Sequence, residues 1–304
     1  MRFDTEVTLS GPLRAPAQML GSQVIRGAKS LHDSDVASSI GLTGAPIEAP
    51  THFSQFDPLA HLVWGDAWYE RGCISGHFRT MVTQGELVRA SLTTRGTTSA
   101  TIEAAKADGT PVLCGTASIG PNHPPSELDQ RRVKKADAGS LYILDQLKVG
   151  VTKHAEDGVS ITAHQLNGPL YPFSLADKLD TITEPNPWYT RAGGASSPWK
   201  RAIVPMEMIS VLAHKSDPQW PIRTPSVGLF LDLEIRLFAG PIFVDECYDI
   251  KSVIVGVGQS RLTESYWSLT SIRNSNSEIP IAEVLLHAGV FKKSYPGYPK
   301  DELD

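Results

Sequence analysis

The sequence is poor in cysteine, has no excess of positive charge and lacks a long apolar run. Its three cysteines, Cys73, Cys114 and Cys247, form no paired spacing, so they indicate neither a disulfide framework nor a zinc knuckle. The formal charge of −5 argues against a nucleic-acid partner. Apolar stretches stay far short of the roughly 20 residues that span a bilayer, and Asp4 and Glu6 stand where a secretory signal would be basic or apolar. The sequence therefore predicts a cytoplasmic protein with no membrane partner.

The composition and length indicate a globular chain with two folded units. Hydrophobic residues make up 41% and charged residues 20% of the chain, which is enough apolar material for a sizeable core. A length of 304 residues exceeds what one small core usually organises. Prolines between residues 120 and 125, followed by a charged stretch, predict an exposed connection. We therefore predict an N-terminal domain over 1–125, a linker over 126–140 and a C-terminal domain over 141–304.

The same order of elements is predicted in both halves. Residues 50–64 carry apolar side chains at helical spacing, and the Asp57-Pro58 pair predicts that a second helical segment starts there. Four short segments between 72 and 119 are typical of an antiparallel meander. In the second half, a helical pattern over 205–214 precedes further strand-like segments between 228 and 293. A helix followed by an antiparallel sheet, present twice, predicts an α+β fold.

Two positions correspond when the starts of the two helices are superposed. Counting back thirteen residues from Ala45 and from Ala202 reaches His32 and Tyr189, and each of these follows a short turn. The internal repeat therefore pairs His32 with Tyr189 near the seam between the two copies.

One helix wrapped by an antiparallel sheet, present twice, resembles the double hot-dog architecture. The segment Glu184-Pro185-Asn186-Pro187-Trp188-Tyr189 also resembles the signature of the MaoC-like dehydratases, the family that includes the (R)-specific enoyl-CoA hydratases. That signature is Gly-Asp-x-Asn-Pro, an aliphatic residue and His. The second copy keeps the Asn-Pro pair, with Glu184 in place of the aspartate and Tyr189 in place of the histidine. The first copy keeps Leu31-His32, while Gly27 stands where the acid is expected.

The resemblance implies a hydro-lyase or related lyase that acts on an acyl thioester, or a similar enol-stabilised substrate, without a metal or redox cofactor. Adding or removing water requires a base, an acid and a donor to the enolate oxygen. By the resemblance, Glu184 is the base, Tyr189 is the acid and Asn186 is the orienting amide. The backbone at Met206 takes the place that polarises the thioester carbonyl.

His32 is a second candidate centre, because Asp33 beside it could fix the tautomer of the imidazole and raise its basicity. The same residues are typical of a helix N-cap, and the Glu184-Pro-Asn-Pro segment is typical of a turn. The predicted substrate-binding residues are Trp188, Met206 and His52.

Two other functions are compatible with the sequence. One is thioester hydrolysis by a hot-dog thioesterase, and the other is a non-catalytic ligand-binding protein in which both half-sites have decayed. The expected partners are a small-molecule substrate, with coenzyme A as the implied thioester carrier, and a second copy in a homodimer, since hot-dog sheets pair side by side. The sequence leaves open the substrate and the half that carries the active site.

Overall fold

The computed structural model describes residues 5–133, 138–155, 157–216, 219–275 and 277–303. The strands of its main sheet are β1 (Thr8–Ser10), β4 (Gly72–Phe78), β5 (Val88–Arg95), β6 (Ser99–Lys106), β7 (Pro111–Ile119), β8 (Thr152–His154), β9 (Gly228–Leu237), β10 (Tyr248–Gln259), β11 (Thr263–Asn274) and β12 (Pro280–Phe291). They form one ten-stranded sheet in the order β1-β5-β6-β7-β4-β9-β12-β11-β10-β8, and all neighbouring pairs are antiparallel. A separate hairpin consists of β2 (Val24–Ile25) and β3 (Ala28–Lys29).

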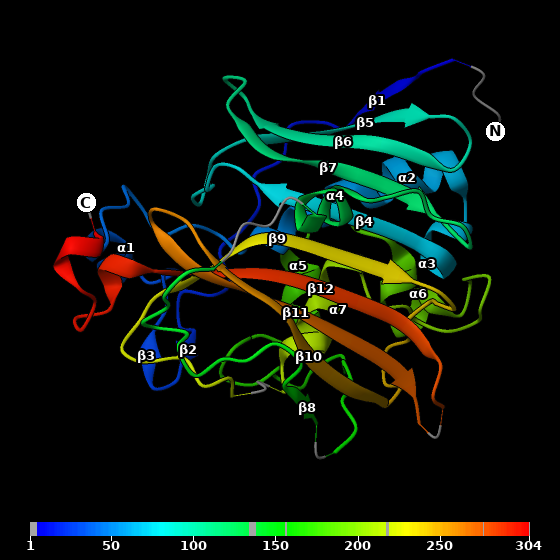
Figure 1. Ribbon diagram of the computed structural model, residues 1–304. Coiled ribbons are helices and arrows are strands. Elements are labelled where there is room, and N and C mark those ends of the chain that lie inside the picture. The colour runs from blue at the N-terminus through cyan, green and yellow to red at the C-terminus, as the bar shows by residue number, and fades with distance from the viewer. Residues whose placement is uncertain (1–4, 134–137, 156, 217–218, 276, 304) are drawn as a thin grey trace.

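The helical elements lie on both sides of this sheet (Figure 1). The α-helices are α1 (Ser34–Ser39), α2 (Asp57–Trp64), α3 (Ala67–Arg71), α4 (Glu127–Val133), α5 (Leu175–Thr181), α6 (Arg191–Gly194) and α7 (Met206–His214). The 3-10 helices are η1 (Ala49–Phe56), η2 (Pro187–Tyr189), η3 (Lys292–Ser294) and η4 (Lys300–Glu302). In Figure 1, α2, α5 and α7 lie behind the sheet and α4 lies in front of it.

The predicted repeat of a helix followed by a meander is confirmed. In the first copy, η1 and α2 precede β4 to β7, and in the second copy α7 precedes β9 to β12. β5 alternates between buried and more exposed residues, as expected for a strand that packs one face on a core. The copies join where β4 pairs with β9, from Cys73 opposite Arg236 to His77 opposite Asp232. The predicted double hot-dog architecture is therefore the observed one.

The first central helix consists of a 3-10 segment and an α-helical segment that meet at the predicted break. The 3-10 helix η1 ends at Phe56, and α2 begins at Asp57 with Pro58 in its first turn. Proline is tolerated there because the amide groups of the first turn have no intrahelical acceptor. Phe53 and Phe56 are fully buried beneath the sheet. η1 and α7 pack against each other, and the amide of Met206 at the start of α7 donates to the carboxyl group of Asp57, directly after η1.

The predicted linker is only partly an exposed connection. Its residues from Glu127 form α4, and Leu128 of that helix is completely buried against Trp267 and Leu285. The amide of Leu128 also donates to Ser75 Oγ on β4. Because the surrounding residues are charged, the sequence does not indicate that Leu128 is buried. This leucine holds α4 across β4 and β9. Residues 134–137 of the predicted linker lie outside the described residues.

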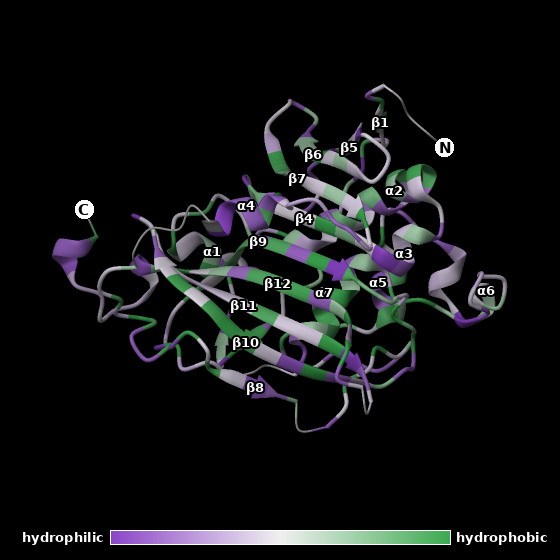
Figure 2. Ribbon diagram, turned by 45° about the vertical axis from the view of Figure 1, so that its right-hand side comes forward, coloured by the Kyte–Doolittle hydropathy of each residue, from purple (hydrophilic) through white to green (hydrophobic). Residues whose placement is uncertain are grey.

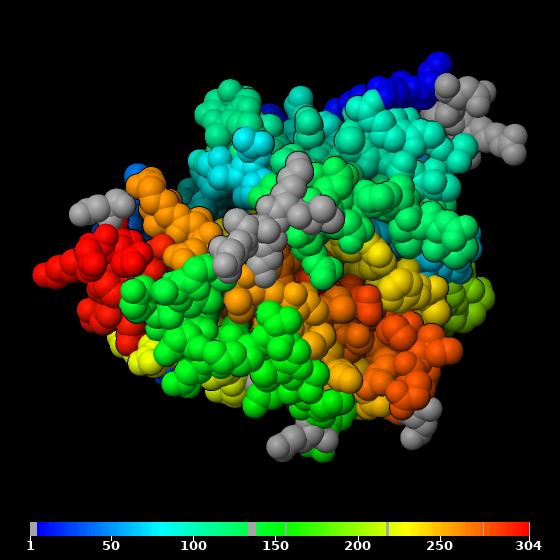
Figure 3. Space-filling model, viewed as in Figure 1, coloured from blue at the N-terminus to red at the C-terminus, as the bar shows by residue number. Residues whose placement is uncertain are grey.

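A long segment covers the outer part of the second copy. In Figure 3 the chain after residue 138, in green, covers the lower left part of the visible face. Ile143 and Leu144 of this segment are buried with Trp220 and Ile254. In Figure 2, α4 is mainly hydrophilic and α7 is mainly hydrophobic, in agreement with their positions outside and beneath the sheet. No helix among the described residues combines the length and apolar character needed to cross a membrane.

A buried aspartate at the centre of the sheet should make the stability of the fold depend on pH. Asp232 is buried and accepts hydrogen bonds from Nδ1 of His77 at 2.8 Å and Nδ1 of His287 at 2.5 Å. Although burial alone would raise its pKa, the bonds from His287 and His77 and the charge of Arg131 lower the pKa of Asp232 to about 2. This ionised carboxylate therefore stabilises the fold fully above about pH 4, and the contribution is lost as pH falls through about 2.

We expect Asp232→Asn to have a lower Tm than the wild type at pH 6, because the variant loses about 2 kcal/mol of the free energy of unfolding. The two Tm values should converge between pH 4 and pH 2. Thermal unfolding followed by circular dichroism measures this difference. A Tm difference that stays constant over that range would contradict a stabilising role for the ionised Asp232 carboxylate.

Candidate active site

The two half-sites are built by the same local structure. Asp33 caps α1 by accepting the amide hydrogens of Asp35 and Val36, and Thr190 caps α6 by accepting that of Gly193. The caps Asp33 and Thr190 lie one residue after His32 and Tyr189. The starts of η1 and α7 follow the two caps at the same distance along the chain. His32 and Tyr189 are thus equivalent positions in the repeat.

The half-site of the second copy is closed by a carboxyl group from the first. Tyr189 is 1% exposed, and its hydroxyl donates to Asp57 Oδ2 at 3.0 Å. Trp68 Nε1 donates to the other oxygen of Asp57 at 2.9 Å, and the amide of Met206 also donates to this carboxyl group. Burial raises the pKa of Asp57 to about 7, and these hydrogen bonds oppose the rise. The Met206 amide is therefore already engaged by a protein acceptor.

The other predicted residues of this half take part in local contacts. Glu184 forms a bidentate ion pair with Arg14, with atoms 2.6 Å and 3.1 Å apart. Asn186 caps η2 and donates from Nδ2 to the hydroxyl of Tyr69 at 3.2 Å. Trp188 packs edge to face on Tyr69, with ring centroids 6.0 Å apart. The apolar cavity that His32 lines, described below, is lined by none of Glu184, Asn186, Trp188, Tyr189 and Met206.

The hydrogen bond between Tyr189 and Asp57 should contribute to the stability of the fold. We expect Tyr189→Phe to lower the free energy of unfolding by about 1–3 kcal/mol, because Asp57 then keeps a buried oxygen without that donor. The ring itself remains packed, so the fold should be retained. Urea unfolding measures the change. A variant as stable as the wild type would show that the Tyr189–Asp57 bond contributes nothing.

The half-site of the first copy opens into a cavity of about 340 Å³. It lies between the start of η1 and the strands β9, β11 and β12 of the second copy, and His32, Glu48 and Ala49 form part of its wall. Most of the wall is apolar. The apolar side chains that line it include Ile25, Leu31, Ile47, Phe78, Trp220, Ile222, Leu229, Phe230, Leu231 and Leu286.

His32 is held in one orientation at this wall. Its Nδ1 lies 2.7 Å from the carbonyl oxygen of Pro46, so Nδ1 carries the hydrogen and Nε2 has a free lone pair. Burial lowers the pKa of His32, although the bond to Pro46 opposes the decrease. Asp33, which the sequence suggested as the orienting acid, instead caps α1 and pairs with Lys29 at 2.6 Å. The backbone carbonyl therefore fixes the tautomer.

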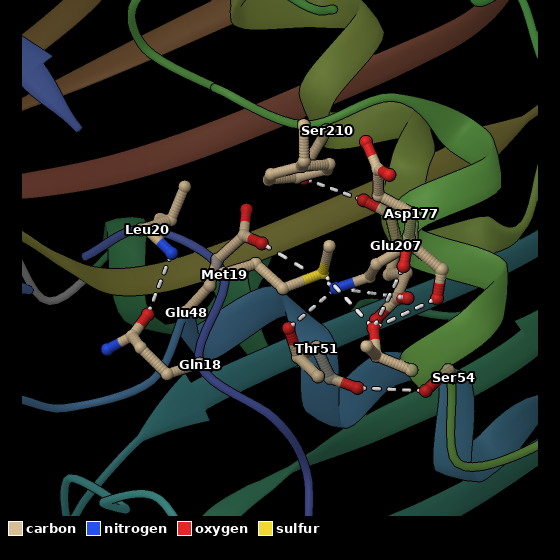
Figure 4. A network of polar contacts seen from close by, with 12 residues as sticks. Gln18, Met19, Leu20, Glu48, Thr51, Ser54, Asp177, Glu207 and Ser210 are labelled. Carbon is tan, nitrogen blue, oxygen red and sulfur yellow. Dashed lines mark hydrogen bonds and ion pairs between the residues drawn. The ribbon is translucent and has the colours of Figure 1, made fainter. Parts of the chain in front are cut away.

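Glu48 is a further acid at the cavity, and the sequence analysis missed it. It is 5% exposed at the N-cap position of η1. Its Oε2 lies 3.8 Å from Nζ of Lys178, while its Oε1 is buried without a hydrogen-bond partner (Figure 4). Burial raises the pKa of Glu48 and Lys178 opposes the rise. The repeat could have revealed it, because Glu48 and Pro205 are equivalent residues directly before the two central helices.

Two more histidines line the cavity. His214 occupies the position in the repeat that Asp57 occupies in the other copy, and its Nδ1 donates to the carbonyl of Ser210 at 2.8 Å. The Nε2 atom of His214 is buried without a partner. His52, predicted to bind substrate, has Nδ1 3.4 Å from Gln55 Oε1. Burial lowers the pKa of both histidines to about 4, so both are neutral at pH 7.

The open half combines three groups that acid/base chemistry needs. A neutral imidazole with a free lone pair can accept a proton, and a carboxyl group with a raised pKa can donate one. Ala49 lines the cavity as the first residue of η1, where helix amides have no intrahelical acceptor. Within the described ranges, no three His, Cys, Asp or Glu side chains are grouped as a metal ion would require.

Comparisons with known proteins identify the fold. No family model matches the chain, and no curated protein sequence is a significant match. A crystal structure described as a MaoC domain protein dehydratase from Chloroflexus aurantiacus J-10-fl superposes with a TM-score of 0.57 at 14% identity, over 95% of each chain. A Mycobacterium tuberculosis protein described as having a double hotdog fold gives 0.52 at 12% identity, over 95% of this chain and 97% of that one. The fold resemblance predicted from the sequence is therefore confirmed.

Proposed function

We propose that the protein is a hydro-lyase that acts on an acyl thioester at the half-site of the first copy. The observation that carries the proposal is that His32 and Glu48 both line the wall of one apolar cavity, with Glu48 at the N-cap of a central hot-dog helix. The fold shared with a MaoC-domain dehydratase agrees with this chemistry. The proposal moves the reaction centre from the Glu184–Tyr189 segment to its equivalent in the other copy.

Each group has a role in the proposed dehydration of a 3-hydroxyacyl thioester. His32 Nε2 removes the proton next to the thioester carbonyl, because its Nδ1 is committed to Pro46. Glu48 gives its proton to the departing hydroxyl group, which leaves as water. The N-terminus of η1 at Ala49 stabilises the negative charge that develops on the thioester oxygen. Hydration of the enoyl thioester follows the same steps in reverse.

The lining of the cavity supports an apolar acyl group as the part of the substrate that enters. Its volume of about 340 Å³ lies at the lower end of the usual range for small-molecule sites, roughly 300–1,000 Å³. Phe230, Leu231 and Leu286 line it from β9 and β12. An acyl chain buried against these side chains would gain about 0.8 kcal/mol per methylene group.

In this proposal the half-site of the second copy has a supporting role. Its helix N-terminus is occupied by Asp57, and Glu184 is neutralised by Arg14. Asn186 and Trp188 fix the segment before α7 through their contacts with Tyr69. These residues hold the seam together, and that seam supports the open half.

A panel of enoyl thioesters with different chain lengths and aromatic acyl groups tests the proposed reaction. Absorbance reports the loss of the double bond, and mass spectrometry of the product reports the addition of water. We expect a gain of one water with at least one member of the panel. Release of free thiol would instead indicate a thioesterase, and binding without turnover would indicate a ligand-binding protein.

A further inference from the structure

One histidine of the cavity wall comes from the central helix of the other copy. His214 is the last residue of α7 and is 8% exposed. Its Nδ1 lies 2.8 Å from the carbonyl oxygen of Ser210, which can only accept a hydrogen bond, so Nδ1 carries a hydrogen. Nε2 is buried and has no hydrogen-bond partner among the described residues. The wall therefore holds a polar atom whose bonding capacity the protein itself leaves unused.

The contacts of the His214 ring determine what Nε2 can bind. Because Nδ1 faces the backbone of its own helix, Nε2, on the other edge of the ring, points away from α7. Phe230 on β9 packs edge to face against the ring, with the two centroids 6.0 Å apart. A second ring hydrogen would put a positive charge into a mostly apolar wall, and neither ring nitrogen contacts a carboxylate. Nε2 therefore presents a lone pair, and the group that fits it is a hydrogen-bond donor.

The repeat indicates where this lone pair lies relative to the proposed reaction centre. Asp57 and His214 are each the ninth residue counted from the start of the central helix of their copy. In the closed half-site, Asp57 accepts hydrogen bonds from the start of the facing helix α7 and from the hydroxyl of Tyr189. The equivalents in the open half-site are the start of η1 and His32, and both line the cavity together with His214. His214 thus faces the reaction centre of the other copy.

The two half-sites differ in what occupies this place. In the closed one, the carboxyl group of Asp57 satisfies the helix start and Tyr189 from within the protein. In the open one, the side chain of Glu48, the N-cap residue of η1, makes no capping hydrogen bond, and His214 offers an acceptor in place of a carboxyl group. A hydroxyl group or a water molecule fits here, because it donates a hydrogen to Nε2 while its oxygen can still take up a proton.

We propose that His214 binds, through Nε2, the hydroxyl group that leaves in the dehydration and the water that adds in the reverse reaction. This inference rests on the proposed function. The hydroxyl hydrogen stays on its oxygen and is donated to Nε2. The oxygen receives the proton of Glu48 and the electron pair of the breaking carbon–oxygen bond, and it leaves as water. His32 takes the proton from the neighbouring carbon, whose electron pair forms the double bond. His214 neither gains nor loses a proton.

Turnover of variants at position 214 tests this role. His214→Phe keeps a ring of similar size against Phe230 and removes the acceptor, so we expect kcat/KM for hydration of an enoyl thioester to fall at least about tenfold. Glutamine places an amide oxygen near the position of Nε2, so His214→Gln should exceed His214→Phe in kcat/KM by at least about threefold. His61→Phe is the matched control, because His61 lies on α2 and does not line the cavity. It should keep wild-type kcat/KM.

Circular dichroism verifies that the variants fold. If His214→Phe does not fold, His214→Leu replaces it, since leucine also lacks an acceptor. A folded variant of either kind with wild-type kcat/KM would overturn the role of His214. Equal losses in His214→Phe and His214→Gln would also overturn it, because the loss would then follow from packing and not from the acceptor.

Equilibrium binding tests the hydroxyl contact without turnover. The ligands are a 3-hydroxyacyl thioester of coenzyme A and the saturated acyl thioester of the same chain length, measured by isothermal titration calorimetry. Glu48→Gln is used as the protein, because it lacks the proposed acid and leaves the ligand intact. We expect the hydroxyacyl ligand to bind at least about fivefold more tightly, and we expect this preference to vanish when His214→Phe is added. Equal binding of the two ligands to Glu48→Gln would overturn the proposed contact.

The two experiments separate this inference from the proposed function. If the wild type hydrates a thioester but Glu48→Gln shows no preference for the hydroxyl group, only the role of His214 is overturned. If the wild type converts no thioester, the proposed function fails. The binding comparison, then made with the wild type, still decides whether His214 holds a hydroxyl group: a preference that depends on His214 supports the contact, and equal binding overturns it.

Discussion

Glu48→Gln is expected to lower kcat by about 10²–10⁴-fold while KM changes little. Glutamine has nearly the same size but cannot give a proton to a departing hydroxyl group. The loss should therefore appear in the chemical step and leave substrate binding intact. Turnover at pH 7 of an enoyl thioester that the wild type hydrates measures the effect. Glu283→Gln is the control, because Glu283 is a half-buried carboxyl group on β12 that does not line the cavity.

The fold of Glu48→Gln should be preserved. The substitution removes one of two buried carboxyl groups near Lys178. The other, Glu207 on α7, has its Oε1 3.4 Å from Nζ of Lys178 and remains as a partner for the ammonium. A loss of activity in a well-folded variant can then be assigned to the missing acid. Wild-type kcat in that variant would exclude Glu48 as the proton donor, whatever the activity of the other variants.

Lys178→Met is expected to lower the free energy of unfolding by about 3–5 kcal/mol near pH 8. Methionine fills much of the same volume but leaves Glu48 and Glu207 as two buried acids without a cation. Their pKa values in the folded protein lie above the unfolded values. In the variant, the folded state therefore loses stability as pH rises through the folded pKa values, and the penalty shrinks towards pH 5.

Urea unfolding at pH 5 and pH 8 measures this destabilisation. Lys153→Met is the control, because Lys153 is exposed on the edge strand β8 and should tolerate the change within about 0.5 kcal/mol. A loss of less than 1 kcal/mol in Lys178→Met at pH 8, or a loss independent of pH, would contradict a charge-compensating role for Lys178.

Much of the fold could be predicted from local patterns. The eight long strands lie within the predicted segments because their side chains alternate and turn residues separate them. The break at Asp57 follows from Pro58, which has no amide hydrogen and therefore fits the first turn of a new helix and not the interior of a continuing one. α4 was missed because one buried leucine among charged residues gives no helical periodicity.

The candidate site was only partly predictable. His32 was found because it matches a family position, but the group that orients it is the Pro46 carbonyl, which carries no sequence signal. Glu48 looks like an ordinary loop residue until Lys178, far along the chain, approaches it. The closure of the other half depends on Asp57, whose carboxyl group reaches Tyr189 across 132 positions. Such contacts between distant segments become visible only in the folded chain.

The assignment of the reaction to one half is tested most directly by comparing His32→Gln with Tyr189→Phe, two equivalent positions of the repeat. Turnover of an enoyl thioester that the wild type hydrates would be measured for both variants at pH 7, with folding verified by circular dichroism. We predict a loss of at least about 100-fold for His32→Gln and a change of less than about threefold for Tyr189→Phe. The reverse pattern would contradict the account and return the active site to the Glu184–Tyr189 segment.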